Sequence, residues 1–68
     1  MNKPVVHFAK SEGVIAEQIL KGTYEVFALD HPRLGKRWVR TSTVLSTVSD
    51  EDGNIIQFET LNTIYKAQ

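Results

Sequence analysis

The run of residues 38–48, WVRTSTVLSTV, constrains the fold of this chain more than any other segment. Its β-branched residues favour a β-strand, because branched side chains pack well on a pleated surface. Strict alternation of apolar and polar residues fails where Val44 and Leu45 follow one another. We therefore expect one long strand with a bulge or a strong bend near residues 42–44.

Turn-forming residues divide the rest of the chain into short segments. Residues 30–35 (DHPRLG) are expected to form a loop, because Pro32 keeps His31 out of the helical region and Gly35 permits a positive φ. Residues 49–54 (SDEDGN) form the clearest turn signal. Further strands are expected at residues 24–29, 55–60 and 63–66, with a bend at 61–62 and a short edge strand at 5–8.

Residues 11–21 (SEGVIAEQILK) are ambiguous between a helix and a strand. Ser11 could cap the start of a helix, and Gly22 stands where a glycine often ends one. The β-branched content and the short connection at residues 21–22 instead favour a hairpin with the strand that follows. The strand is our preferred interpretation, and one short helix is the alternative.

These segments predict a single mainly β domain over residues 1–68. Several short strands around one long bent strand indicate a highly curved antiparallel sheet or a small SH3-like or OB-like barrel, with room for one short helix. A chain of 68 residues buries only about 60% of its unfolded surface, so self-association into a homo-oligomer is expected to add stability. The expected core residues are Ile15, Tyr24, Val26, Val39, Leu45, Ile56, Phe58 and Ile64.

The charge balance argues against a general nucleic-acid-binding protein. Eight basic and eight acidic residues give a formal net charge of zero, whereas binding through phosphate contacts usually needs a basic excess. One local basic cluster remains, with Trp38 among its members. The cluster consists of Arg33, Lys36, Arg37 and Arg40.

Catalytic and metal-dependent functions lack their usual residues. The sequence has no cysteine and no glycine-rich phosphate loop, and Ser42 has only His31 as a potential base. His7 and His31 do not have the spacing of metal ligands. We therefore predict no catalytic residue, metal or cofactor. No apolar run approaches the roughly 20 residues of a transmembrane helix, and the first residues do not resemble a signal peptide, so a cytoplasmic location is expected.

Polar side chains in residues 30–42 and 58–65 predict a ligand-binding site where these two segments pair. Arginine can clamp a phosphate, tryptophan can stack on a base, and hydroxyls and amides can bind phosphate oxygens or base edges. Each residue also has a structural interpretation, as a turn former, a strand former or a core residue. The candidate ligand-binding residues are His31, Arg33, Trp38, Arg40, Thr41, Ser42, Thr60, Asn62, Thr63 and Tyr65.

Three ordered motifs lie between His31 and Tyr65, a span of about half of the chain: HPRxG at residues 31–35, VRTSxV at 39–44 and ETxNTxY at 59–65. This pattern resembles a group of small, mostly uncharacterised proteins encoded by bacteriophages, prophages and plasmids. The resemblance implies an accessory protein that binds and disables a host component, such as a defence nuclease or a nucleotide signal.

The leading hypothesis is a non-catalytic counter-defence protein that sequesters a nucleotide-derived immune signal in the host cell cytoplasm. One alternative is an inhibitor that binds a host defence protein or nuclease directly. Others are a small SH3-like or OB-like nucleic-acid accessory protein and a structural component of the virion.

Overall fold

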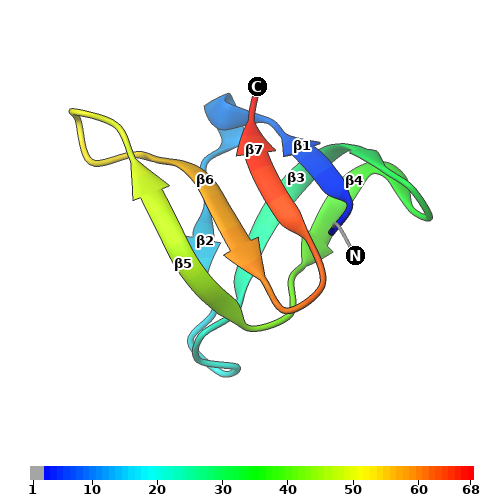
Figure 1. Ribbon diagram of the computed structural model, residues 1–68, viewed down its shortest axis with the longest axis horizontal. Helices are drawn as coiled ribbons and strands as arrows, with labels where there is room; N and C mark the ends of the chain where they lie inside the picture. The colour runs from blue at the N-terminus through cyan, green and yellow to red at the C-terminus, as the bar shows by residue number, and fades with distance from the viewer. Residues whose placement is uncertain (1–2) are drawn as a thin grey trace.

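The computed structural model describes residues 3–68, which form seven β-strands and one short 3-10 helix (Figure 1). In chain order the elements are β1 (Val5–Phe8), η1 (Lys10–Glu12), β2 (Ile15–Ala16), β3 (Tyr24–His31), β4 (Gly35–Arg40), β5 (Val44–Ser49), β6 (Ile55–Thr60) and β7 (Ile64–Ala67).

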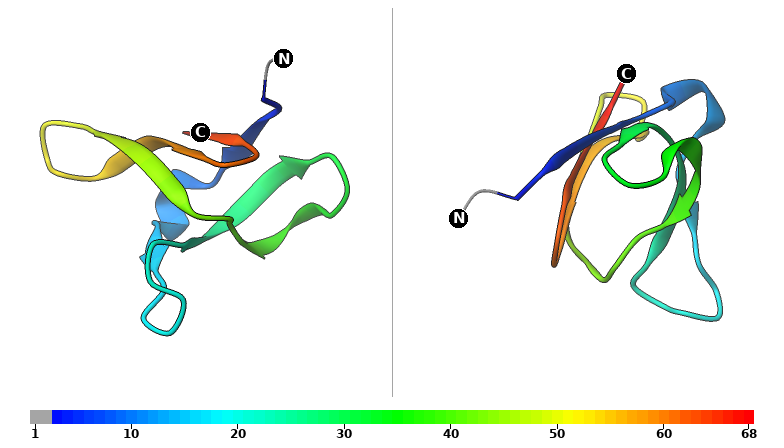
Figure 2. Two further views of the ribbon diagram at one scale, coloured as in Figure 1. Left: turned by 60° about the horizontal axis from the view of Figure 1, so that its bottom comes forward. Right: turned by 90° about the vertical axis from the view of Figure 1, so that its right-hand side faces the viewer.

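All seven strands belong to one sheet in the order β2-β3-β1-β7-β6-β5, and β4 pairs with β3. The sheet curls strongly into a half-barrel, which confirms the predicted fold class (Figure 2). Most strand pairs are antiparallel, but β1 and β7 are parallel, with Val5 opposite Ile64. The prediction of a short edge strand at residues 5–8 was therefore wrong, because β1 lies between β3 and β7.

Residues 41–43 break the predicted long strand into β4 and β5. The Thr41 N–H donates to the Tyr24 carbonyl at 2.8 Å, and the Val44 N–H donates to the Gly22 carbonyl at 2.7 Å. The predicted bend is confirmed, although it ends one strand and begins another. A bulge follows at Leu45, where the register with β6 shifts.

The core lies on the concave side of the sheet and consists of Val6, Phe8, Val26, Ala28, Val39, Phe58 and Tyr65. Phe58 and Tyr65 stack with ring centroids 4.7 Å apart. Of the predicted core residues, Val26, Val39 and Phe58 are buried, and Tyr24, Ile56 and Ile64 are half-buried.

Two predicted core residues are exposed instead. Ile15 is 49% exposed because β2 is only two residues long and pairs with β3 alone. Leu45 is 56% exposed because it lies at the bulge of β5, at the end of the sheet.

The segment 11–21 forms neither a long strand nor an α-helix. It contributes to η1 and forms β2, which pairs with β3 so that Ile15 lies opposite Glu25. The connection to β3 covers residues 17–23 rather than the predicted pair 21–22. The turn predicted at residues 49–54 is confirmed over residues 50–54, because Asp50 Oδ1 accepts the N–H groups of Asp52 and Asn54 at 2.9 Å each, while Ser49 ends β5.

Candidate functional site

A hollow of about 580 Å³ lies between the β3–β4 hairpin, the start of β1 and the β6–β7 turn. The segments 30–42 and 58–65 do not pair as predicted but face each other across this space. Ten residues line the hollow: Pro4, Val6, His31, Pro32, Arg33, Arg40, Ser42, Asn62, Thr63 and Tyr65. The fold thus brings most of the candidate residues together, while Trp38, Thr41 and Thr60 do not line the hollow.

The lining of the hollow favours a negatively charged ligand. It contains two guanidinium groups, of Arg33 and Arg40, and no carboxylate. Arg40 Nε lies 3.6 Å from Glu17 Oε1, and the Arg40 side chain remains half-exposed. Within residues 3–68, no carboxylate lies within 4 Å of Arg33, so its charge can be offered to a ligand.

The β3–β4 turn is built by His31. Its ring atom Nδ1 accepts the backbone N–H groups of Arg33 and Leu34, each at 3.1 Å. A ring nitrogen that accepts two hydrogen bonds carries no proton, so the neutral ring has its proton on Nε2. Gly35, at φ 71°, then returns the chain into β4. His31 therefore fixes the position of Arg33 beside the hollow.

Asp30 precedes His31 in the sequence, but its side chain binds His7. Its carboxylate accepts the His7 backbone N–H at 2.6 Å and contacts His7 Nδ1 at 2.6 Å. These bonds from His7 lower the pKa of Asp30 below its usual value. β1 and β3 pair directly only at Phe8 and Ala28, so the Asp30 carboxylate holds the two strands together beyond that pair.

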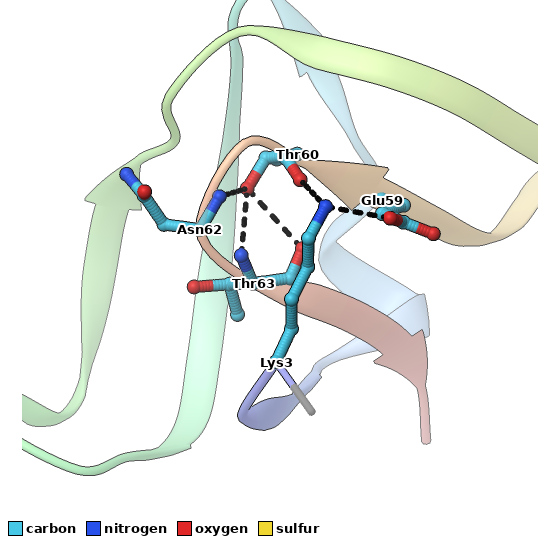
Figure 3. A network of polar contacts seen from close by, with 5 residues as sticks. All are labelled: Lys3, Glu59, Thr60, Asn62 and Thr63. Atoms are coloured by element: carbon cyan, nitrogen blue, oxygen red, sulfur yellow. Dashed lines mark hydrogen bonds and ion pairs between the residues drawn. The ribbon is translucent and has the colours of Figure 1, made fainter. Parts of the chain in front are cut away.

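The β6–β7 turn is built by Thr60 (Figure 3). Its hydroxyl Oγ1 accepts the N–H groups of Asn62 at 3.3 Å and Thr63 at 3.1 Å, and it donates to the Thr63 carbonyl at 3.2 Å. Thr60 is fully buried, so its hydroxyl serves the turn and not a ligand. The Asn62 side chain points away from this network, which leaves its amide available to the hollow.

Lys3 connects the start of the described chain to the same turn. Its Nζ donates to Glu59 Oε2 at 2.6 Å and to the Thr60 carbonyl at 2.7 Å (Figure 3). Sequence reasoning identified neither Lys3 nor the contact between His7 and Asp30. No local pattern signals these contacts, because the partners are far apart in the sequence. Lys3 lies 56 and 57 positions from its two partners, and His7 lies 23 positions from Asp30.

Two further candidate residues, Thr41 and Trp38, pack within the fold and do not line the hollow. Thr41 is buried, and its Oγ1 accepts the Tyr24 N–H at 3.1 Å and donates to the Ser42 carbonyl at 2.8 Å, which fixes the corner between β4 and β5. Trp38 packs edge-on against Phe27 with centroids 5.6 Å apart and is 39% exposed. These two aromatic residues lie opposite each other on β3 and β4.

The alternation of side chains between the two faces of a strand predicts which of these residues are buried. Phe58 and Thr60 are two residues apart on β6, so a buried Phe58 places Thr60 on the same inward face. The same rule applied to Val39 places Trp38 on the opposite face and Thr41 on the buried one.

Tyr65 forms part of the apolar floor of the hollow, with Val6 beside it. Its ring stacks on Phe58 and is almost fully buried, and this burial raises the pKa of Tyr65 above its usual value. The hydroxyl is therefore neutral at physiological pH. Tyr65 offers the hollow an apolar surface and an uncharged polar group.

Within residues 3–68, no cluster of three histidine or acidic side chains is close enough to hold a metal ion. No helix in the same part of the chain is long and apolar enough to cross a membrane. Comparisons with protein-family models, with curated proteins and with solved structures find no match to this chain. The resemblance to small phage and plasmid proteins therefore stays a prediction from the three sequence motifs.

Proposed function

We propose that this chain is a non-catalytic binding protein that takes a phosphate-bearing, nucleotide-type ligand in the hollow between the β3–β4 and β6–β7 turns. The observation that carries this proposal is the lining, which combines Arg33 and Arg40 with hydroxyl and amide groups and contains no carboxylate. Guanidinium groups bind phosphate oxygens in pairs, and about 580 Å³ lies within the usual range of small-molecule sites.

The floor of the hollow favours a ligand with an organic part over inorganic phosphate. Pro4 and Pro32 expose apolar surface to the hollow, and the nearly buried Val6 and Tyr65 lie beneath it. A base or ribose ring can cover this surface while its phosphate contacts the guanidinium groups. Ser42, Asn62 and Thr63 then supply hydrogen bonds to the phosphate or to the base edge.

The three sequence motifs support the biological context. HPRxG supplies His31 and Arg33, VRTSxV supplies Arg40 and Ser42, and ETxNTxY supplies three more residues of the same hollow: Asn62, Thr63 and Tyr65. Because these motifs resemble phage and plasmid proteins, the ligand we propose is a nucleotide-derived immune signal. The protein would remove this signal from the host cytoplasm by stoichiometric binding.

The experiment is titration calorimetry, combined with native mass spectrometry, against a panel of cyclic oligonucleotides and ADP-ribose derivatives. We expect a stoichiometric complex with at least one of them, and more than tenfold weaker binding in Arg33→Ala and in Arg40→Ala, since each removes a charged hydrogen-bond donor. Arg37→Ala is the matched control, because Arg37 is an exposed arginine of β4 that does not line the hollow. The absence of heat and of bound mass for every ligand contradicts the proposal, as does an equal loss in Arg37→Ala.

A second candidate function is direct inhibition of a host defence protein. It is favoured by Leu34, which is 48% exposed in a turn that His31 holds in one conformation. An apolar side chain on a turn that is already held in one conformation loses little conformational freedom on binding, which favours a contact with a partner protein. This candidate predicts that one host protein co-purifies with the chain and is lost in Leu34→Ala, while the nucleotide titrations remain silent.

A further inference from the structure

β4 and β5 occupy the margins of the curled sheet but differ in how they are protected from pairing with another strand. Natural edge strands usually carry charges, prolines or a covering segment, because their free N–H and C=O groups otherwise pair with another chain. β4 carries Lys36, Arg37 and Arg40 among its six residues. β5 has the sequence VLSTVS and carries no charge and no proline.

The outer side of β5 is open. β6 is its only strand partner among residues 3–68, and Figure 1 shows β5 at the margin of the molecule with β6 on its inner side. The Val44 N–H reaches the Gly22 carbonyl, but for residues 45–49 no backbone hydrogen bond to a strand other than β6 is present in the described chain. Leu45 and Val48 are both at least half exposed.

We propose that β5 pairs antiparallel with β5 of a second copy of this chain, so that two half-barrel sheets join across a two-fold axis. In such a symmetric pair, the residue at the axis lies opposite itself, and any charge there would face an identical charge. The pairing with β6 is regular over residues 46–48 and irregular on either side, which places the axis at Thr47. Ser46 of each copy then lies opposite Val48 of the other.

A second copy is favoured over a foreign strand because β5 has no charge or pocket that would select a particular partner. The uncharged strand is compatible with its own copy, and the zero net charge of the chain adds no general repulsion. An isologous contact of this kind closes at two subunits, and the cations of β4 discourage further growth at the other edge. β5 does not line the hollow, so this inference is independent of the proposed ligand.

Sedimentation equilibrium of the full chain, from micromolar to millimolar concentration, tests the proposal. We expect a monomer–dimer equilibrium whose dissociation constant rises more than tenfold in Thr47→Lys and in Thr47→Glu, because like charges then meet at the axis. Mixing the two variants in equal amounts restores the dimer, since opposite charges now face each other. Ser11→Lys adds the same charge at an exposed position outside β5 and leaves the equilibrium unchanged.

A chain that stays monomeric up to millimolar concentration overturns the proposal. So does a dimer that persists in Thr47→Lys, or a mixture of the two variants that stays monomeric. Amide hydrogen exchange of the unaltered protein gives a readout that does not depend on how the variants fold. We expect exchange in residues 45–49 to slow as concentration rises while exchange in β4 does not change, and an equal response of both strands counts against the β5 contact.

Discussion

The β3–β4 turn and the β6–β7 turn face each other across the hollow and are built by the same device. In each, one side-chain acceptor takes two backbone N–H groups. His31 Nδ1 accepts the backbone N–H groups of Arg33 and Leu34, each at 3.1 Å. Thr60 Oγ1 accepts the backbone N–H groups of Asn62 and Thr63 in the β6–β7 turn. Both turns thereby present polar side chains to the same space from opposite sides.

The two turns differ in their access to water. Thr60 is fully buried, whereas His31 is only half-buried. The hydrogen bonds to Thr60 are part-buried and those to His31 are exposed, so donors that lose their acceptor reach water more easily in the β3–β4 turn. The same hydrogen-bond pattern should therefore contribute much more stability at the β6–β7 turn. The β3–β4 turn should be the half of the site that opens first.

Thr60→Val should give the largest effect on stability. Valine keeps the shape of threonine but cannot accept the N–H groups of Asn62 and Thr63. We expect the free energy of unfolding to fall by about 1–2 kcal/mol, because two part-buried donors lose their acceptor. Urea unfolding followed by Trp38 fluorescence measures the change. Thr43→Val is the matched control, since Thr43 is exposed and its hydroxyl makes no hydrogen bond among residues 3–68; a loss of the same size there would contradict the comparison.

His31→Ala should have a smaller effect at the opposite turn. The N–H groups of Arg33 and Leu34 lose their acceptor but remain accessible to water, so we expect a loss of about 0.5–1 kcal/mol, as for an exposed cap. Amide exchange of Leu34 should accelerate. His31→Asn should restore both values, because a short amide oxygen can accept the same N–H groups. A loss as large as that of Thr60→Val would show that the two turns do not differ as proposed.

Local chemistry was sufficient to predict both turns and the bend between β4 and β5. Pro32 and Gly35 bracket the first turn, and the adjacent apolar pair at residues 44–45 marks the bend. The closure of the sheet could not be predicted in this way. It depends on parallel pairing of Val5 with Ile64, and no local pattern specifies which strands meet across such a separation.

Most of the candidate site residues were gathered by the fold, but their individual roles followed from the face of the strand on which they lie. Thr60 and Thr63 have the same side chain, yet one is buried in the turn and the other lines the hollow. Trp38 looked like a stacking platform for the same ligand, yet it packs on Phe27 away from the hollow. Residue type predicted the chemistry, and tertiary packing decided where it is available.

The start of the described chain contacts both sides of the hollow, because Lys3 binds at the β6–β7 turn and His7 of β1 binds Asp30 near the end of β3. Lys3→Met probes the contact with the β6–β7 turn. Methionine keeps most of the apolar stem but loses the bonds to Glu59 and to the Thr60 carbonyl. Because both Lys3 and Glu59 are partly exposed, we expect a loss of only about 0.5 kcal/mol. High salt should reduce this difference. Lys66→Met is the control, because Lys66 is an exposed lysine of β7 with no ion pair in the described chain. Urea titrations should show a smaller change in the free energy of unfolding for this variant. An equal change would mean that the bonds of Lys3 do not stabilise the β6–β7 turn.

The contact between His7 and Asp30, on the β3–β4 side of the hollow, depends on pH. It gives the smallest but most specific prediction. Hydrogen bonds from His7 lower the pKa of Asp30, so the folded state binds its proton less readily than the unfolded chain. The stability that this carboxylate adds is present above its ordinary pKa of 3.8 and is lost as pH falls through the lower folded value. Asp30→Asn removes this contribution, so the variant should be less stable than the native chain at pH 5, and the difference should shrink towards pH 2.

Urea unfolding of both proteins at half-unit intervals of pH measures that difference directly. Glu51→Gln is the control, because Glu51 is exposed and forms no ion pair within residues 3–68, so its removal should give a nearly constant offset over the same range. The Thr60 hydroxyl does not titrate in this range, so its hydrogen bonds within the β6–β7 turn should persist while the Asp30 contact is lost. A difference between Asp30→Asn and the native chain that does not vary with pH would mean that the Asp30 carboxylate does not hold β1 to β3 in solution.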